Sequence, residues 1–459
     1  MNVVDISSRR ATASSAPPVA GQPVEARPVS LPAPPRERRP SGPVRAEALL
    51  GLASRHFSPT PAAARAAIVA LARRTSGGTL VLKDARGSLR LGRGPLSAEV
   101  CVHDDRAYTA VLARGSVGLG QGYVAGWWSS PDLTALVRVL YRWTQGPRLH
   151  LDRAAAVAAP ALDALARRRA PRPEDDRRNI ASHYDLSNRF FEVMLGASMA
   201  YSCAVFAGPT TSLDAAQEAK FARLCAKASL RPEDSVLEVG TGWGGFALYA
   251  ARHFGCRVTT TTISAEQRRY AEEAVKAAGL SHLVTVIGDD WRELRGRYDK
   301  LVSVEMVEAV DWRLHDDFLR KCSDLLHPAG KAVFQAIVMD DASFERAKRH
   351  QDFVRKMVFP GGCIPSVSSL VRSARSTDLR LVDLEDIGRH YARTLRLWSD
   401  NIGTRGDELA RLGAGQDLLR LWSLYLAYCE ASFLERHISD VQMVFVKPGW
   451  RGALEERPA

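Results

Sequence analysis

The sequence contains few cysteines and no long apolar run. Seven cysteines are scattered over 459 residues, and no two of them form a Cys-x-x-Cys pair. This pattern disfavours a disulfide framework and a zinc cluster and fits a reducing compartment, so no metal site is predicted. No segment approaches the ~18 consecutive apolar residues of a membrane-spanning helix. The first residues lead into small, polar and proline residues rather than an apolar segment, which predicts a cytoplasmic protein without a secretory signal.

The composition is that of a soluble globular protein. Hydrophobic residues make up 46% of the chain and charged residues 25%. At roughly 150 residues per domain, the length suggests two or three domains. Lysine and arginine outnumber aspartate and glutamate by 63 to 51, which gives a formal net charge of +12. Such an excess favours a polyanionic partner, either a nucleic acid or an anionic membrane surface.

The first part of the chain divides by composition. Residues 1–44 contain nine of the 24 prolines and little periodic apolar pattern, which predicts a disordered arm. Residues 45–165 are interpreted as a smaller mixed α/β domain. The basic, proline-bearing segment 166–178 is either a linker or a strip that faces a membrane. Within the N-terminal domain we expect helices at 45–74, 131–143 and 151–165, strands at 79–83, 88–91 and 99–103, and a glycine-rich segment at 115–128.

Residues 179–450 alternate between strand-like and helix-like segments. Alternation at this pace indicates βαβ units around a mostly parallel sheet, so the expected fold class is α/β, with a short tail at 451–459. We expect strands at 235–239, 257–262, 284–287, 300–304 and 331–336, helices at 244–254 and 265–278, and a late edge strand at 441–446.

A glycine-rich turn follows the first of these strands. Residues 235–245 read SVLEVGTGWGG, and their glycines permit backbone conformations and close approaches that a Cβ would block. The turn lies at the carboxyl end of a strand, where open α/β sheets bind ligands. Glycines alone fit a dinucleotide or a simple tight turn. Glu238, which is placed to meet an ammonium group, and the E-x-G-x-G-x-G-G spacing favour S-adenosylmethionine over a dinucleotide.

The next two strand ends carry polar side chains that suit either of two roles. Thr262 and Gln267 are neutral hydrogen-bonding groups where a dinucleotide site would have an acid for the ribose. The same segment also suits a helix N-cap at Ser264. After the third strand, Asp290 and Trp291 offer a carboxylate for the edge of an adenine and an indole for its face. Alone, Asp290 fits a loop-capping residue equally well.

Five sequence stretches occur in order along the chain, and one of them contains the glycine turn. Together they are far more specific evidence than the glycine turn alone. With them the chain resembles the cyclopropane-fatty-acyl-phospholipid synthase family, and within it the actinobacterial unsaturated-fatty-acid methyltransferases that make 10-methylene or tuberculostearic-type lipids. The resemblance implies a class I S-adenosylmethionine methyltransferase fold, Rossmann-like with a mostly parallel seven-stranded sheet, over 179–450. Gly126–Trp128 extends it to the N-terminal domain. The stretches are HYDLSNRFFEVMLGASMAYSCAVF (183–206), VLEVGTGWGGFALYAARHFGCRVTTTTISAEQ (236–267), YDKLVSVEMVEAV (298–310), FPGGCIPS (359–366) and HYARTLRLW (390–398).

The resemblance also implies site residues. It implies a bicarbonate ion as catalytic base, with ligands that fall on Cys203 and Ile337 through their backbones and on the side chains of Glu308 and Tyr391. The chain departs from the family where Gln335 stands in place of a common histidine and Glu308-Ala309 in place of Glu-His, and glutamine cannot carry a proton. The cofactor contacts that the resemblance implies are Tyr201, Ser202, Gly240, Gly242, Thr262, Gln267 and Asp290. The residue arguments above add Glu238 at the glycine turn and Trp291 after the third strand.

The implied chemistry adds one carbon to the cis double bond of a phospholipid-bound unsaturated, oleoyl-like acyl chain. Methyl transfer leaves a carbocation, which must be kept dry and must lose a proton to a base. Proton loss from the added methyl group closes a cyclopropane, whereas a prior hydride shift gives a methylene; the motifs favour the methylene. Aromatic faces can stabilise the cation, although the spacing of those near the C-terminus, Trp398, Trp422, Tyr425, Tyr428 and Phe433, is typical of core residues.

The partners follow from this chemistry. We expect a peripheral enzyme at the inner face of the membrane, with an anionic phospholipid surface as partner and no nucleic acid. The resemblance implies that the N-terminal domain supplies lipid docking or homodimer contacts, and a methylene product would need a separate reductase. Two alternatives are a methyltransferase for a non-lipid acceptor and a non-catalytic lipid-binding protein. The HYDLSN, YSC and FPGGCIPS stretches argue against the first, and the intact turn with Glu308 and Tyr391 against the second.

Overall fold

The computed structural model describes residues 60–144 and 187–452, which all belong to one compact unit spanning Arg55–Ala459. The expected arm at 1–44, the helix at 151–165, the segment at 166–178 and almost all of the tail at 451–459 lie outside the described residues. No helix in the described ranges is long and apolar enough to cross a bilayer.

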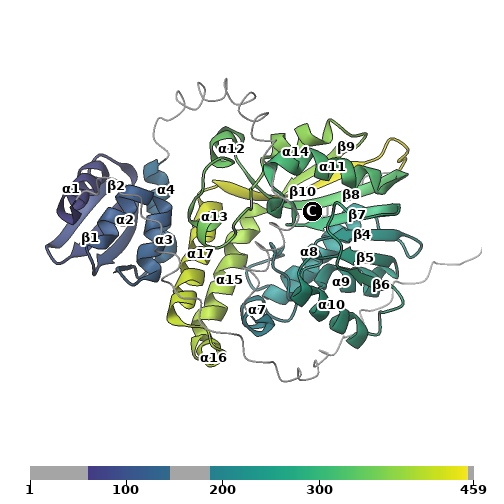
Figure 1. Cartoon of the computed structure of the whole chain (residues 1–459), viewed down its shortest axis with the longest axis horizontal. Helices are drawn as coiled ribbons and strands as arrows, with labels where there is room; N and C mark the ends of the chain where they lie inside the picture. Colours follow the sequence, from purple (N-terminus) through teal and green to yellow (C-terminus); the bar gives the residue numbers. More distant parts are fainter. Residues whose placement is uncertain (1–59, 145–186, 453–459) are drawn as a thin grey trace, which may run out of the picture. The chain divides into compact units, whose positions relative to one another are not determined.

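The described N-terminal residues form a small mixed α/β arrangement (Figure 1). Strand β1 pairs along both of its sides with β2, so that Leu82 is the partner of Leu89 and also of Val100. The expected strands at 88–91 and 99–103 are therefore the two halves of one long strand. The elements are α1 (Pro61–Ala72), β1 (Ser76–Asp84), β2 (Gly87–Val102), α2 (Arg106–Arg114), α3 (Ser116–Val124), β3 (Trp128–Ser129) and α4 (Leu133–Thr144).

The glycine-rich segment forms helix α3, which glycine content alone would disfavour. Close packing explains the glycines. A Cβ on Gly118 would lie 1.9 Å from the Ala110 carbonyl oxygen, and one on Gly120 would lie 2.2 Å from the Phe353 ring. Phe353 begins α13 (Phe353–Met357), so the glycines let α3 approach a helix far away in the sequence.

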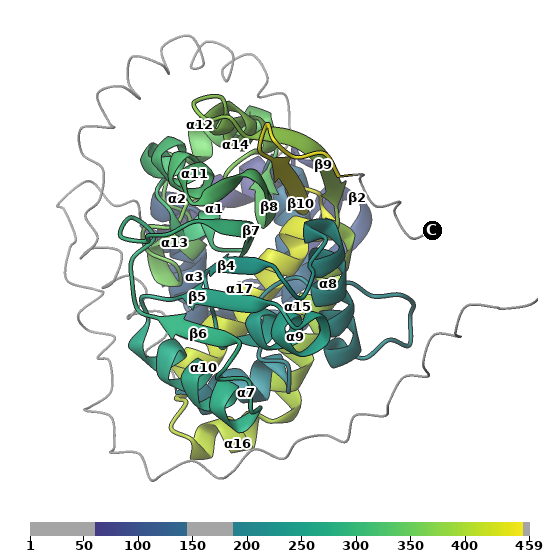
Figure 2. The same ribbon diagram turned by 90° about the vertical axis from the view of Figure 1, so that its right-hand side faces the viewer.

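The main sheet has seven strands in the order β6-β5-β4-β7-β8-β10-β9 (Figure 2). Parallel pairing joins β6, β5, β4, β7 and β8, which confirms the predicted mostly parallel sheet. The strands are β4 (Ser235–Val239), β5 (Arg257–Thr261), β6 (Val284–Ile287), β7 (Tyr298–Val304), β8 (Leu326–Met339), β9 (Arg380–Asp386) and β10 (Ile438–Val446).

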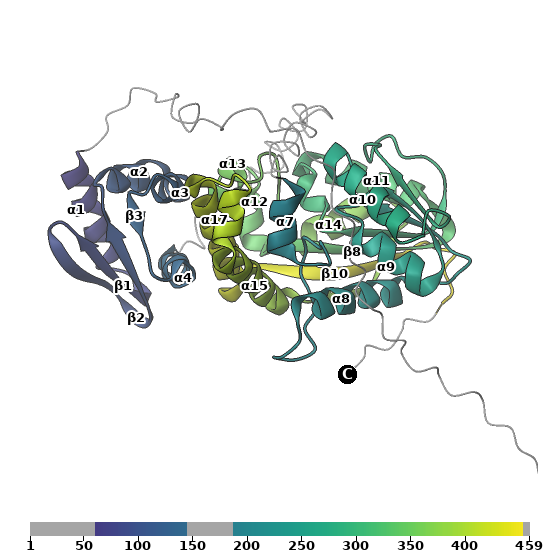
Figure 3. The same cartoon turned by 90° about the horizontal axis from the view of Figure 1, so that it is seen from below.

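The last strand corrects the sequence prediction. Residues 441–446 do form a strand, but β10 lies inside the sheet, antiparallel to both β8 and β9, and β9 forms the edge. Figure 3 shows the long strand β10 beside β8. The β9 sequence RLVDLED is charged and alternating, as is typical of an exposed edge strand. Buried β10 instead carries the polar side chains Asp440 and Gln442 into the interior.

Helices cover both faces of the sheet. Alternate strand residues point to opposite faces: Val236 and Val302 pack with α8 (Leu213–Ala228) and α9 (Gly245–Phe254), whereas Leu237 and Leu301 pack with α11 (His315–Asp324) and α14 (Val367–Ala374). The remaining helices are α7 (Asn188–Leu195), α10 (Ala265–Ala277), α12 (Asp341–Ala347), α15 (Tyr391–Thr404), α16 (Gly406–Arg411) and α17 (Gln416–Leu434), with short 3-10 turns η2 (Val307–Ala309), η3 (Trp312–Leu314) and η4 (Gly388–His390).

Candidate active site

The glycine turn joins β4 to α9. Gly240, Gly242 and Gly244 have φ angles of +103°, +53° and +92°, which side-chain-bearing residues rarely adopt. The N–H groups of Gly240 and Thr241 donate to the Thr261 carbonyl oxygen at 3.1 and 2.9 Å, which ties the turn to β5. A Cβ on Gly242 would meet no atom within 4 Å. The turn therefore presents bare backbone to open space, which suits close approach by a ligand.

Glu238 is buried directly before this turn. Its carboxyl accepts a 2.5 Å hydrogen bond from Thr260 Oγ1, which lies 2.7 Å from Thr241 Oγ1. Burial raises the pKa of Glu238 to about 8. A second charged group brought to this carboxyl, such as a ligand ammonium, would favour its ionised form.

The polar residues at the next strand ends are held by neighbours. Thr262 Oγ1 donates to Gln267 Oε1 at 2.8 Å. The Asp290 carboxylate accepts from the Arg292 N–H at 2.9 Å and from its guanidinium at 2.8 Å. The Trp291 ring packs edge-on against Phe318 at 5.3 Å, and Arg292 lies over it. The N-cap at Ser264 is also present, because its Oγ accepts from the Gln267 N–H.

Tyr201 and Ser202 lie in the loop before α8. The Tyr201 hydroxyl donates to the Tyr425 hydroxyl at 3.0 Å. Ser202 Oγ accepts from the fully buried Lys220 ammonium at 2.6 Å, and burial lowers the pKa of Lys220 to about 8.

A second cluster forms where β7, β8 and β10 bring acidic and amide side chains together. Glu305 follows β7 and is half-buried, with a φ angle of +48°. Its Oε1 accepts from the Cys203 N–H at 2.7 Å and from Gln335 Nε2 at 2.8 Å. Its Oε2 accepts from the Tyr391 hydroxyl at 2.5 Å. Two of the expected bicarbonate ligands, Cys203 and Tyr391, thus converge with Gln335 on one side chain that sequence analysis did not single out.

Amide side chains connect this carboxylate to β10. Gln335 Nε2 lies 3.0 Å from Asp440 Oδ2, and Gln442 Nε2 donates to Gln335 Oε1 at 3.0 Å. Burial, together with the nearby Glu305 and Glu308, raises the pKa of Asp440 well above its ordinary value. The raised pKa favours the neutral form of Asp440, and its Oδ1 has no hydrogen-bond partner.

Glu308 lies on η2, three residues after Glu305. Its Oε1 accepts from the Ile337 N–H, while its buried Oε2 has no hydrogen-bond partner. Burial and the charge of Glu305 raise the pKa of Glu308 to about 8. The acid cluster lies next to the glycine turn, because a Cβ on Gly240 would be 3.0 Å from the Met306 side chain.

A bicarbonate ion does not fit the residues expected to hold it. The N–H of Cys203 and the hydroxyl of Tyr391 are bonded to Glu305, and the N–H of Ile337 is bonded to Glu308. An added anion would find these donors engaged and would lie against the Glu305 carboxylate. Like charges at such distances are unfavourable in a buried site.

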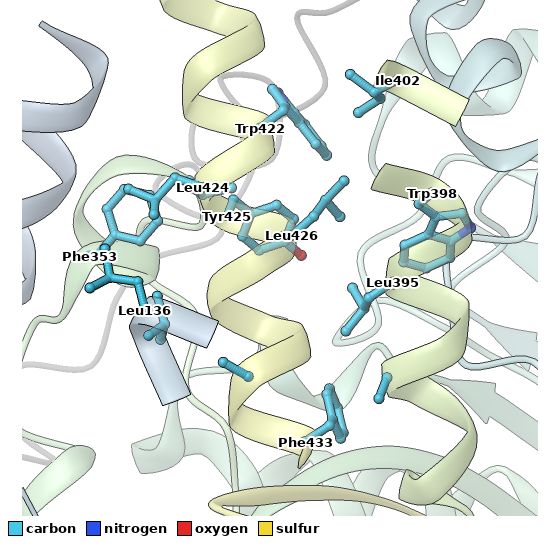
Figure 4. Close-up of a cluster of buried hydrophobic side chains, with 14 of the residues drawn as sticks. Leu136, Phe353, Leu395, Trp398, Ile402, Trp422, Leu424, Tyr425, Leu426 and Phe433 are labelled. Carbon is cyan, nitrogen blue, oxygen red and sulfur yellow. The ribbon is translucent and has the colours of Figure 1, made fainter. Parts of the chain in front are cut away.

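Aromatic rings line the side of the cluster that faces α15 and α17. Tyr391 stacks on Phe433 with ring centroids 4.4 Å apart and meets Trp398 at 6.1 Å. Trp422 packs edge-on against Tyr425 at 5.4 Å. Figure 4 shows side chains of the two helices directed into the space between them. All five rings are buried. Of the rings predicted to be core residues, Trp398, Trp422, Tyr425 and Phe433 are buried, whereas Tyr428 is half-buried. The faces of these rings can also stabilise a cation.

Sequence reasoning found one half of this cluster. Glu305, Asp440, Gln442 and Lys220 were not singled out. The signal for Glu305 was the repeated acid in V-E-M-V-E after the fourth strand, whereas Asp440 and Gln442 enter only because β10 is an interior strand. Among the described residues, no group of three or more His, Cys, Asp or Glu is arranged to hold a metal ion.

The strand order of the sheet, the glycine turn and the helices that cover both faces of the sheet define a class I methyltransferase fold. The structure of mycolic acid cyclopropane synthase CmaA1 complexed with SAH and CTAB matches with a TM-score of 0.56 at 25% identity, over 59% of this chain and 98% of that one. Coclaurine N-methyltransferase, at 22% identity and a TM-score of 0.58 over 72% of this chain and 99% of that one, shares the fold.

Residues 172–443 match the family described as mycolic acid cyclopropane synthetase, and the chain belongs to this family. It is 38% identical to tuberculostearic acid methyltransferase UfaA1 of Mycobacterium tuberculosis, over 77% of this chain and 84% of that protein. It is 31% identical to cyclopropane-fatty-acyl-phospholipid synthase of Escherichia coli K12, over 77% of this chain and 88% of that protein. The fold class and the family resemblance predicted from the sequence are confirmed.

Proposed function

We propose that this chain transfers a one-carbon unit from S-adenosylmethionine to the cis double bond of a phospholipid-bound unsaturated acyl chain. The observation that carries this proposal is the junction of the glycine turn with a buried acid cluster and an aromatic wall. Gly240 contacts Met306, the residue after Glu305, and Glu305 is bonded to Tyr391 between Phe433 and Trp398. Electrophile, base and cation-stabilising rings would thus lie side by side.

The cofactor residues proposed are those at the turn and the adjoining strand ends. The bare backbone of Gly240 and Gly242, with the Glu238 carboxyl below it, suits the amino-acid end of the cofactor. Thr262, Gln267, Asp290 and Trp291 would hold its ribose and adenine, and Tyr201 and Ser202 would border its methyl group. When bound, the sulfonium supplies an electrophilic methyl group strong enough for an alkene.

The residues of the acid cluster would then control the fate of the positive charge. Tyr391 and Trp398 would exclude water and face the cation, and a base beside them would remove a proton. The name of the UfaA1 relative favours a 10-methylene product, a precursor of a methyl-branched, tuberculostearic-type chain, over a cyclopropane. A methylene product would pass to a separate reductase.

The remaining parts of the proposal concern location and assembly. The net charge of +12 suits an anionic phospholipid surface at the inner face of the membrane. We assign lipid docking and homodimer contacts to the N-terminal domain (45–165) and methyl transfer to 179–450.

Mass spectrometry of acyl chains tests the function. The full chain is incubated with S-adenosylmethionine and vesicles of an oleoyl phospholipid. We expect a mass gain of one carbon, and hydrogenation then separates a methylene from a ring. No gain while the cofactor still binds would contradict a lipid acceptor, and absence of cofactor binding would favour a non-catalytic lipid-binding protein.

A further inference from the structure

The structure places a side chain of the protein where the family resemblance implied an external anion. Glu305 receives hydrogen bonds from the Cys203 N–H, the Gln335 amide and the Tyr391 hydroxyl. The first and third of these groups were expected to hold bicarbonate. The carboxylate of a glutamate and a bicarbonate ion share the same planar pair of oxygens, so one can stand in for the other.

The backbone at this position is unusual for a glutamate. With φ at +48°, Glu305 occupies the left-handed region, which favours glycine. Such conformations persist only where surrounding contacts enforce them, and they cluster at functional sites. Here the conformation carries the side chain from the end of β7 to the three donors.

The surrounding charges favour one ionised acid in the cluster. Burial raises the pKa of both Asp440 and Glu308, which favours the neutral form of each. Burial also raises the pKa of Glu305, but the bonds from Tyr391, Cys203 and Gln335 and the charge of Lys220 oppose this. Hydrogen bonds to the charged form stabilise a carboxylate, so Glu305 is the acid placed to accept a proton.

We propose that Glu305 is the catalytic base of this enzyme and replaces bicarbonate. This inference rests on the proposed function. A C–H bond of the transferred methyl group breaks. Its electron pair forms the new C–C bond of a ring or, after a hydride shift has moved the positive charge to the carbon that bears the methyl group, the π bond of a methylene. The proton forms an O–H bond on Oε2 of Glu305, the oxygen shared with Tyr391, and the enzyme later releases it to water.

Two substitutions in carbon-dioxide-free buffer test the base. Glu305→Gln keeps the shape but cannot accept the proton, and we expect turnover to fall ~100-fold or more. Glu305→Gly relieves the left-handed backbone and frees the three donors, so its lost turnover should return saturably with added formate or bicarbonate. Wild-type turnover should not change when bicarbonate is removed or added. Glu272→Gln, on the exposed side of α10, serves as the matched control.

The proposal is overturned if Glu305→Gln retains turnover within about threefold of wild type, or if depleted wild type needs bicarbonate. A binding measurement does not depend on turnover: titration with ¹³C-labelled bicarbonate, followed by NMR, should show saturable binding to Glu305→Gly and none to wild type. Saturable binding to wild type would overturn the replacement. If wild type forms no lipid product, the proposed function fails by itself, and the titration still decides whether Glu305 occupies the anion site.

Discussion

At the scale of single residues, the site contains several buried ionisable groups, and burial favours the neutral form of most of them. Glu238 and Glu308 have pKa values of about 8, and Lys220 has a pKa of about 8, because burial disfavours the charged form of each. An isolated buried charge is costly. The cluster lowers this cost by keeping several acids neutral and by holding the remaining carboxylate with hydrogen bonds.

Substitution of Glu308 tests its part in this network. Glu308→Gln keeps an acceptor for the Ile337 N–H but cannot exchange a proton next to Glu305. We expect turnover to fall on the order of 100-fold, while S-adenosylmethionine binding stays unchanged because Glu308 makes no bond to the glycine turn. Initial rates and calorimetric titration measure the two quantities. Near-normal turnover would remove Glu308 from the active site.

The stability of the folded protein should fall with rising pH in one range and increase with rising pH in a second, higher range. The folded protein holds protons on Glu238 and Glu308 between their ordinary pKa of 4.5 and about 8, where the unfolded chain has lost them. The free energy of unfolding therefore falls as pH rises through this window. Lys220, whose pKa is lowered from 10.5, has the opposite effect from about pH 8 to 10.5.

Denaturant unfolding at pH 5.5 and pH 8 checks the first window. Glu308→Gln removes one of the acids whose pKa is raised, so its loss of stability between these pH values should be smaller than that of wild type. Equal losses in the two proteins would contradict the raised pKa of Glu308.

The residues that sequence analysis could predict are those that follow a strand within a local motif. Glu238, Gly240, Gly242 and Glu308 are of this kind. Glu305 belongs to the same segment, but its bonds to Cys203, Gln335 and Tyr391 join positions up to 102 residues away. Such convergence depends on strand order, which a single sequence does not specify.

At the scale of elements, the local sequence pattern predicted the bounds of strands well. It predicted poorly which strands lie next to one another in the sheet. The strands at 235–239 and 284–287 are confirmed to the residue, because short apolar runs end at clear turn signals. The edge position of 441–446 was wrong, because β9 has a charged sequence that periodicity does not mark. Helix α3 was not predicted from the sequence, because its glycines resemble those of turns although they serve close packing.

Substitution of a packed glycine tests this explanation of α3. Gly120→Ala should lower the free energy of unfolding by about 1–3 kcal/mol, because the new methyl group overlaps the buried Phe353 ring. Helix propensity alone would give the opposite sign, with alanine favoured by about 1 kcal/mol. Gly403 in α15 has no atom within 4 Å of an added Cβ, so Gly403→Ala should stabilise the protein. If both substitutions stabilise, close packing does not account for Gly120.

At the scale of the whole molecule, the N-terminal helices are bonded to a helix that borders the site. Thr134 and Arg138 on α4 contact Glu430 and Glu435 at the end of α17, with distances of 2.8 and 2.7 Å. Arg142 also binds Glu435. Helix α17 carries Trp422, Tyr425 and Phe433 of the aromatic wall. These contacts link the segment assigned to lipid docking with the wall assigned to the acyl chain.

Electrostatic docking predicts that vesicle binding depends on salt and lipid charge. A net charge of +12 attracts anionic headgroups over about 10 Å at 0.1 M salt but only about 3 Å at 1 M. We expect binding to phosphatidylglycerol vesicles to weaken ~10-fold or more between these salt concentrations, with weak binding to phosphatidylcholine at both. Sedimentation with vesicles measures this.

Turnover on detergent-dispersed oleoyl lipid separates docking from chemistry. The acid cluster is buried, and buried charges are screened far less than exposed ones. Turnover on dispersed lipid should therefore change little over the same salt range, while turnover on anionic vesicles should fall together with binding. If salt weakens both reactions equally, the charge dependence lies in the reaction itself. If neutral and anionic vesicles bind equally well, apolar contacts rather than the basic surface bring the protein to its substrate.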